Sequence, residues 1–109
     1  MTYSIYQLPQ LYSYSFMPFE RAKESGFNID HYTCVYHGSE IVYEDGSECD
    51  NPKEVLEYLF TKFNIDTPED FHGHLLSTSD IVELIYDNKD EFYYCEPFGW
   101  EDVTTFCQF

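Results

Sequence analysis

Two histidines stand two positions apart near the middle of the chain, as His72-Gly73-His74. In an extended segment, residues i and i+2 point to the same side, so both imidazoles could bind one ion. A cysteine thiolate would suit such a site, because sulfur and imidazole nitrogen are the usual ligands of tetrahedral zinc. A zinc site is therefore one hypothesis, and its candidate ligands are His72, His74, Cys49 and Cys34.

The same residues could serve the fold without a metal. His74 could make a structural hydrogen bond, and a buried Cys95 would behave as a small apolar residue. Cys34 and His37 have C-x-x-H spacing, but alternation along a strand would put them on opposite faces, roughly 10 Å apart. They could share an ion only if their segment were a turn. We expect that no cofactor is required, with zinc as the one that the sequence allows.

The sequence contains no motif that is typical of an enzyme active site. It has no Gly-x-Ser-x-Gly motif and no Gly-rich phosphate loop. Because 21 residues are acidic, the spacing of any two carboxylates carries no information. We predict that the protein is not an enzyme. A hydrolase that uses His74 and Asp80 is the least favoured hypothesis.

The chain is strongly acidic, with a formal charge of −16 from 21 acidic and 5 basic residues. Such a charge indicates disorder only where apolar groups are scarce, and this chain has 11 Tyr, 10 Phe and one Trp. We therefore expect a folded domain. Five basic residues are too few to neutralise a phosphate backbone, which argues against direct binding of nucleic acid.

Carboxylates on a folded surface can instead imitate the phosphates of DNA and bind a basic protein groove. No basic residue follows Lys89. The alternative is that these acids form an ordinary solvated surface. The candidate partner-binding residues are Glu44, Asp45, Glu48, Asp50, Asp66, Glu69, Asp70, Asp87, Asp90, Glu91, Glu96, Glu101 and Asp102, with Trp100 as an aromatic anchor.

A length of 109 residues fits a single domain spanning residues 1–109. The pattern predicts strands at residues 3–8 and 31–36, and a helix from Pro18 that ends at Ser25-Gly26. After Leu11, Tyr or Phe alternates with Ser as far as Phe16, which predicts a second strand or extended segment at residues 11–16, with Tyr12, Tyr14 and Phe16 on one face. Gly38-Ser39 predicts either a turn into a hairpin with residues 40–43 or a longer irregular loop.

The main helix is expected to begin at Asn51 and Pro52, with apolar residues at helical spacing as far as Phe63. A turn at Thr67-Pro68, a one-turn helix and a crossing at Gly73 should follow. Residues 81–86 and 91–95 predict a hairpin. Phe98-Gly99-Trp100 predicts a bend, and residues 103–109 a short strand or helical turn. The predicted fold is α+β, a mostly antiparallel sheet with one main amphipathic helix and one or two short helices on one face.

No stretch approaches the roughly 18 apolar residues of a membrane span, and the first ten residues lack the features of a signal peptide. We therefore expect a cytoplasmic protein without membrane contact. In that reducing compartment, the four cysteines should be free thiols or metal ligands and not disulfides.

A run of motifs lies between the main helix and the strand that follows it: Phe63-Asn64-Ile65, Pro68-Glu69-Asp70-Phe71, Gly73-His74 and residues 77–82. Further motifs are residues 3–8, Val35-Tyr36, Phe92-Tyr93-Tyr94 and Phe98-Gly99. In these motifs, and so over nearly its whole length, the chain resembles the YodL-like domain, a small module of Firmicutes that is often carried by conjugative and other mobile elements. The resemblance implies no established enzyme chemistry.

The resemblance and the acidity together suggest a function. Mobile elements and phages carry small acidic proteins that disable the defence enzymes of the bacterial host. We expect an inhibitor of a nucleic-acid-targeting defence enzyme, an anti-CRISPR protein against a Cas9-type effector, that binds a basic surface with an acidic, aromatic-rich face. The alternative is a zinc-binding accessory domain of a conjugative element with no inhibitory activity.

Overall fold

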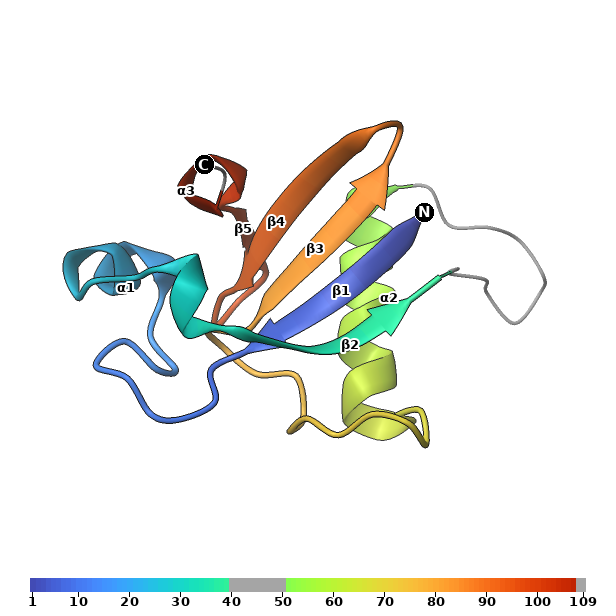
Figure 1. Ribbon diagram of the computed structural model, residues 1–109, viewed down its shortest axis with the longest axis horizontal. Coiled ribbons are helices and arrows are strands. Elements are labelled where there is room, and N and C mark those ends of the chain that lie inside the picture. Colours follow the sequence, from blue (N-terminus) through green and yellow to red (C-terminus); the bar gives the residue numbers. More distant parts are fainter. Residues whose placement is uncertain (40–50, 108–109) are drawn as a thin grey trace.

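The computed structural model describes residues 1–39 and 51–107. In these ranges the chain forms one five-stranded sheet of order β2-β1-β3-β4-β5, in which every neighbouring pair is antiparallel (Figure 1). The predicted α+β class is confirmed. The strands are β1 (Thr2–Gln7), β2 (Thr33–Gly38), β3 (Ile81–Tyr86), β4 (Lys89–Cys95) and β5 (Trp100–Asp102).

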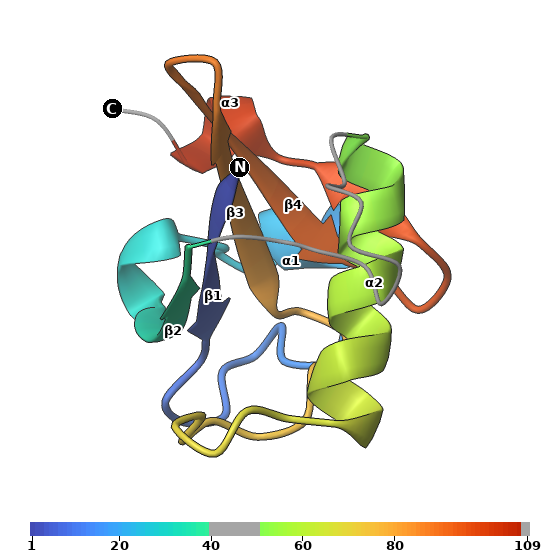
Figure 2. The ribbon, with the colours of Figure 1, turned by 90° about the vertical axis from the view of Figure 1, so that its right-hand side faces the viewer.

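The long helix α2 (Pro52–Ile65) covers one face of the sheet (Figure 2). It begins where the sequence predicted, because the Asn51 side chain accepts a hydrogen bond from the Lys53 N–H at 3.0 Å. Its buried residues Val55, Leu56, Leu59 and Phe63 pack on Tyr3, Ile5, Val82 and Leu84 of the sheet. Each such buried side chain contributes about 1.5–3 kcal/mol.

The short helices pack on the opposite face, so the expectation that all helices share one face is wrong. Ile81 and Tyr94 point away from α2 and form a second core with Tyr14, Phe19 and Val103. Because side chains alternate along a strand, Ile81 and Val82 serve different cores. The helices on this face are α1 (Phe19–Glu24), the 3₁₀ turn η1 (Ile29–His31) and α3 (Thr104–Cys107).

Residues 13–16 form turns, so the strand or extended segment predicted for residues 11–16 is wrong. The Ser15 N–H donates to the Tyr12 carbonyl and the Met17 N–H to that of Tyr14, each at 3.1 Å. Tyr14 is buried while Phe16 is 60% exposed, so the aromatic residues do not share a face. Serine explains the difference, because the Ser15 hydroxyl accepts the Tyr12 N–H and stabilises a turn within an alternating pattern.

The segment between α2 and β3 is simpler than expected. The Phe71 N–H donates to the Pro68 carbonyl at 3.0 Å, which closes a single turn in place of a one-turn helix.

Asp87 and Asn88, with φ angles of 50° and 61°, make a two-residue hairpin turn between β3 and β4. Residues 103–109 were expected to be a strand or a helical turn, and α3 supplies the helical turn. The hairpin expected at residues 40–43 lies outside the described residues.

Candidate functional site

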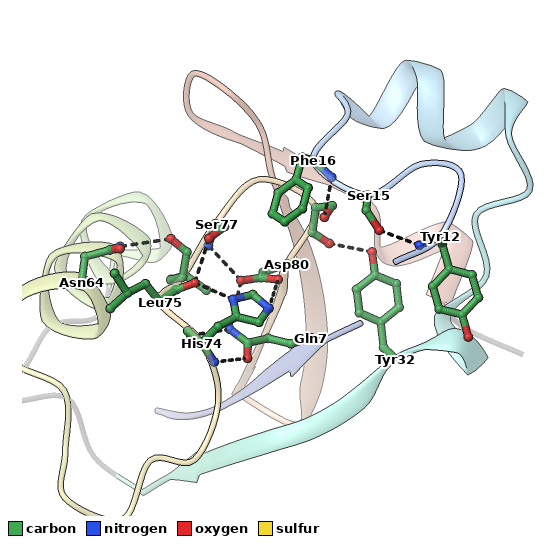
Figure 3. Close-up of polar contacts among 12 residues, drawn as sticks. Gln7, Tyr12, Ser15, Phe16, Tyr32, Asn64, His74, Leu75, Ser77 and Asp80 are labelled. Carbon is green, nitrogen blue, oxygen red and sulfur yellow. Dashed lines mark hydrogen bonds and ion pairs between the residues drawn. The ribbon is translucent and has the colours of Figure 1, made fainter. Parts of the chain in front are cut away.

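A buried carboxylate, Asp80, lies where the loop before β3 meets the end of β1 (Figure 3). Its Oδ2 accepts hydrogen bonds from Gln7 Nε2 at 3.0 Å and from the Ser77 N–H at 2.8 Å. The Gln7 amide also donates to the His74 carbonyl at 2.8 Å and accepts the His74 N–H at 3.0 Å. A Cβ at Gly73 would lie 2.3 Å from Gln7 Oε1, so a larger residue there would displace the Gln7 amide from these bonds.

The His74 ring lies between the protein interior and solvent. Its Nδ1 is 2.7 Å from the Leu75 carbonyl oxygen, an acceptor, so Nδ1 carries the proton that is donated there. Its Nε2 is 3.7 Å from Asp80 Oδ1. The His74 side chain is 49% exposed while that of Asp80 is 4% exposed. The side chain of His74 thus holds its own loop and faces the carboxylate.

Burial raises the pKa of Asp80 from 3.8 to about 7. The Ser77 N–H, the His74 ring and the Gln7 amide oppose this rise, because each favours the ionised form. The carboxyl group therefore changes its charge near neutral pH.

Two residues beside Asp80 have strained backbones. Phe16 and Ser79 have φ angles of 64° and 81°, a region that residues with side chains rarely adopt. They are bonded to each other, since the Phe16 N–H donates to Ser79 Oγ at 3.1 Å. The Ser79 N–H donates to the Cys95 carbonyl, and the Tyr32 hydroxyl donates to the Ser79 carbonyl at 2.6 Å. Such strain persists only where surrounding contacts fix it, and it is common at binding sites.

These residues enclose a pocket of about 190 Å³, named the Asp80 pocket below. Its apolar walls are Leu8, Leu11 and Phe16. Its polar lining includes Ser15, His74, Ser79 and Asp80. Ligand pockets usually have about 300–1,000 Å³. This smaller space suits a single side chain better than a cofactor.

The nearby hydroxyl groups are bonded to the backbone. Ser77 Oγ donates to the Leu75 carbonyl at 2.8 Å, and Ser79 Oγ accepts the Phe16 N–H. A serine nucleophile needs a bond to a base such as histidine. The geometry therefore gives the hydrolase hypothesis no support, and the lack of enzyme activity stays a prediction.

The structure does not join the predicted zinc ligands into one site. His72 is exposed, Cys34 is exposed on the edge strand β2, and Cys49 lies outside the described residues. Within residues 1–39 and 51–107, no group of three or more His, Cys, Asp or Glu side chains could hold a metal ion. Zinc binding therefore stays a prediction.

A β-bulge changes the expected geometry of Cys34 and His37. Cys34 lies opposite Tyr6 and His37 opposite Ser4, because Val35 is an extra residue in the pairing of β1 with β2. Both side chains therefore lie on the same face of the sheet, so the expectation of opposite faces is wrong. His37 Nδ1 is hydrogen-bonded to Ser4 Oγ at 2.8 Å.

The predicted partner-binding acids do not form one patch. Residues 66–70 follow the end of α2, while residues 87–90 form the hairpin at the opposite end of the molecule (Figure 1). Glu96 Oε1 accepts the Phe19 N–H at 2.8 Å, and Asp102 accepts the Thr104 N–H at 3.0 Å, so both have structural roles. Glu91 accepts a hydrogen bond from the Tyr86 hydroxyl. Glu44, Asp45, Glu48 and Asp50 lie outside the described residues.

An aromatic residue that the site prediction did not include projects from the turn between β4 and β5. Phe98 is 98% exposed, and the turn is closed by the Glu96 N–H donating to the Gly99 carbonyl at 3.0 Å. Gly99 has a φ of 84°. The sequence predicted a bend at Phe98-Gly99-Trp100, and the bend lies at residues 97–99. The adjoining Phe98 pocket has about 440 Å³ and is lined by Pro18, Phe19, Glu20, Lys23, Glu96, Phe98, Trp100 and Glu101.

Trp100 connects this pocket to a larger groove. The half-buried ring lies edge-on to Phe60 of α2, with 6.5 Å between ring centroids. It also lines an open groove of about 880 Å³ between the start of α2 and the end of the sheet. On the other side, the consecutive residues Phe16, Met17 and Pro18 link the Phe98 pocket to the Asp80 pocket. One shared residue and one short segment therefore connect the three hollows.

Fold and site together define a small α+β domain with an exposed, aromatic-lined surface. The chain belongs to the YodL-like domain family, because the sequence model of that family matches residues 2–106. No curated protein and no solved structure matches the chain. None of the helices in the described part of the chain has the length and apolarity needed to cross a bilayer.

Proposed function

We propose that this domain inhibits a nucleic-acid-targeting defence enzyme of the bacterial host, most specifically a Cas9-type effector, by binding its basic nucleic-acid-handling surface. The observation that carries the proposal is Phe98, which is 98% exposed beside a pocket lined by Glu20, Glu96 and Glu101. An aromatic ring held out among carboxylates suits a protein partner that is basic and has apolar cavities.

Exposed apolar side chains at the Asp80 and Phe98 pockets support the proposal of a protein partner. Leu11 is 79% exposed and Phe16 60%, and both line the Asp80 pocket, while Met17 is 36% exposed and precedes Pro18 of the Phe98 pocket. Burying a large apolar side chain contributes about 1.5–3 kcal/mol. Buried aromatic anchors carry much of the binding energy in protein interfaces. Phe98 and Phe16 are therefore the expected anchors.

Charge supports a basic partner. The chain has a formal charge of −16, and Lys23 is the one basic residue that lines the Phe98 pocket. The Lys23 ammonium already lies over the Phe19 and Phe106 rings, 5.7 Å and 5.6 Å from their centroids. A DNA-binding channel is strongly cationic, and opposite charge accelerates association. The resemblance to modules of mobile elements favours a defence enzyme as the target.

The proposal is tested with a purified Cas9-type effector and its DNA substrate. The domain should bind the effector, compete with DNA and reduce cleavage at about 50 mM salt, and do so much less at about 200 mM salt. Phe98→Ala should weaken binding at least about tenfold. Ile65→Ala is the matched control, because Ile65 is 81% exposed at the far end of α2.

An affinity for the effector that does not change with salt concentration would contradict the electrostatic part of the proposal. Equal affinities of Phe98→Ala and Ile65→Ala would contradict the role of Phe98. No inhibition of any effector would favour the accessory-domain alternative. That alternative predicts stoichiometric zinc in the purified protein and a loss of folding stability on chelation.

A further inference from the structure

We propose that the Asp80 pocket takes one arginine side chain from the surface of the protein partner, with the guanidinium N–H groups donating to both Asp80 Oδ1 and His74 Nε2. The identity of that partner rests on the proposed function above. The chemistry of the pocket rests on its own lining, which holds a carboxylate and an imidazole and no basic residue of Lys or Arg type.

The carboxylate and the imidazole leave two acceptor atoms without a close donor. Asp80 Oδ2 already accepts two hydrogen bonds, from Gln7 and Ser77. Oδ1 faces His74 Nε2 at 3.7 Å, which is longer than the usual hydrogen-bond range of about 2.7–3.2 Å. Since His74 Nδ1 donates to a carbonyl, Nε2 of the neutral ring is an acceptor. A group with several N–H donors would satisfy both atoms.

The walls of the pocket suit the rest of an arginine side chain. Leu8 and Leu11 offer apolar contact to the methylene groups, which arginine buries readily while its charged end is hydrogen-bonded. The Phe16 ring offers a face on which a guanidinium can stack. The volume of about 190 Å³ limits the occupant to about one side chain.

The pocket is held in shape before any ligand arrives. Phe16 and Ser79 keep left-handed backbones through the bond between them, and the Tyr32 hydroxyl fixes the Ser79 carbonyl. The Gln7 amide binds both the N–H and the carbonyl of His74 and so fixes the backbone of this residue. A preorganised site loses less entropy on binding than a flexible one. A weak probe molecule should therefore bind at a measurable concentration.

The test uses the whole domain, labelled with ¹⁵N, titrated with N-acetylarginine amide and followed by NMR. The amide signals of Leu11, Phe16 and Ser79 should shift and saturate together. N-acetylcitrulline amide has nearly the same shape without the charge, and it should bind at least about tenfold more weakly. Equal binding of the two probes, or shifts spread over the acidic surface, would overturn the proposal.

Variants separate the pocket from the overall charge. Asp80→Asn should reduce arginine binding at least about tenfold. Glu24→Gln removes one exposed charge outside the pocket and should leave arginine binding unchanged. Should Asp80→Asn not fold, Phe16→Ala replaces it, and arginine binding several-fold weaker is then expected. Unchanged arginine binding in the folded variants would overturn the proposal.

The arginine site and the proposed inhibition can fail independently of each other. The arginine titration contains no enzyme, so a lack of effector inhibition does not affect its outcome. Conversely, an effector that binds wild type and Asp80→Asn equally would leave the proposed function standing and would overturn the pocket as an arginine site.

Discussion

The Asp80 pocket and the Phe98 turn are connected by the short segment Phe16-Met17-Pro18 but are built in opposite ways. Asp80 is 2% exposed and is tied by hydrogen bonds to β1 and to its own loop. Phe98 is 98% exposed, on a turn closed by one backbone hydrogen bond. The first region should control both stability and selectivity, while the second should contribute to binding alone. The following predictions test this contrast.

The largest expected effect is that of Gln7→Ala. Gln7 is 2% exposed, and its loss leaves the His74 N–H and carbonyl without their partner and Asp80 Oδ2 with one donor fewer. Leaving a buried polar group unpaired costs about 1–3 kcal/mol. We expect the free energy of unfolding to fall by about 4 kcal/mol, as measured by urea denaturation.

Gln10→Ala is the matched control for this prediction, because Gln10 is an exposed glutamine that also borders the Asp80 pocket. Its unfolding free energy should stay within about 0.5 kcal/mol of wild type. Equal destabilisation by both substitutions would mean that the Gln7 network does not support the fold.

The second prediction concerns pH. Because burial raises the pKa of Asp80 from 3.8 to about 7, the folded state favours the protonated carboxyl. Its stabilising effect is complete below pH 3.8 and is lost as the pH rises to about 7. Asp80→Asn carries no charge at any pH. The variant should therefore gain stability relative to wild type between about pH 4 and 7, by at most about 4 kcal/mol.

Urea denaturation at several pH values from about 4 to 8 measures this difference. Glu101→Gln serves as the control, because it removes an exposed carboxylate from the same acidic chain. Its difference from wild type should change little with pH. If the difference in unfolding free energy between Asp80→Asn and wild type also did not change with pH, Asp80 would ionise at the same pH in the folded and the unfolded chain.

The sequence predicted the elements whose signals are local. Asn51 and Pro52 marked the start of α2, and the alternation of residues 3–8 marked β1. Prediction from the local pattern failed at residues 11–16, where the Ser15 hydroxyl stabilises a turn within an alternating run. It also failed at Val35, since one extra residue in a strand reverses the faces of those beyond it.

The Asp80 pocket could be predicted only in part. The sequence indicated His74 and Asp80 as residues that could do chemistry. Gln7, however, is 73 positions from Asp80, and no local pattern links the two. Phe98 was placed in a bend without a sign that its ring is exposed. Exposure depends on what the folded chain leaves uncovered, and aromatic residues are more often partly buried than fully exposed.

The smallest expected effect on stability is that of Phe98→Ala. Its ring is 98% exposed, so its removal uncovers almost no buried surface, and the unfolding free energy should change by less than about 0.5 kcal/mol. Gly99, which provides the left-handed backbone of the turn, is retained. The same substitution is expected to weaken partner binding at least about tenfold, because a buried aromatic anchor would be lost. Thermal denaturation and the effector-binding measurement, made on one preparation, compare the two effects. A Phe98→Ala protein that is clearly destabilised would mean that the ring supports the fold, and the contrast between a structural Asp80 region and a contact-making Phe98 turn would then be lost.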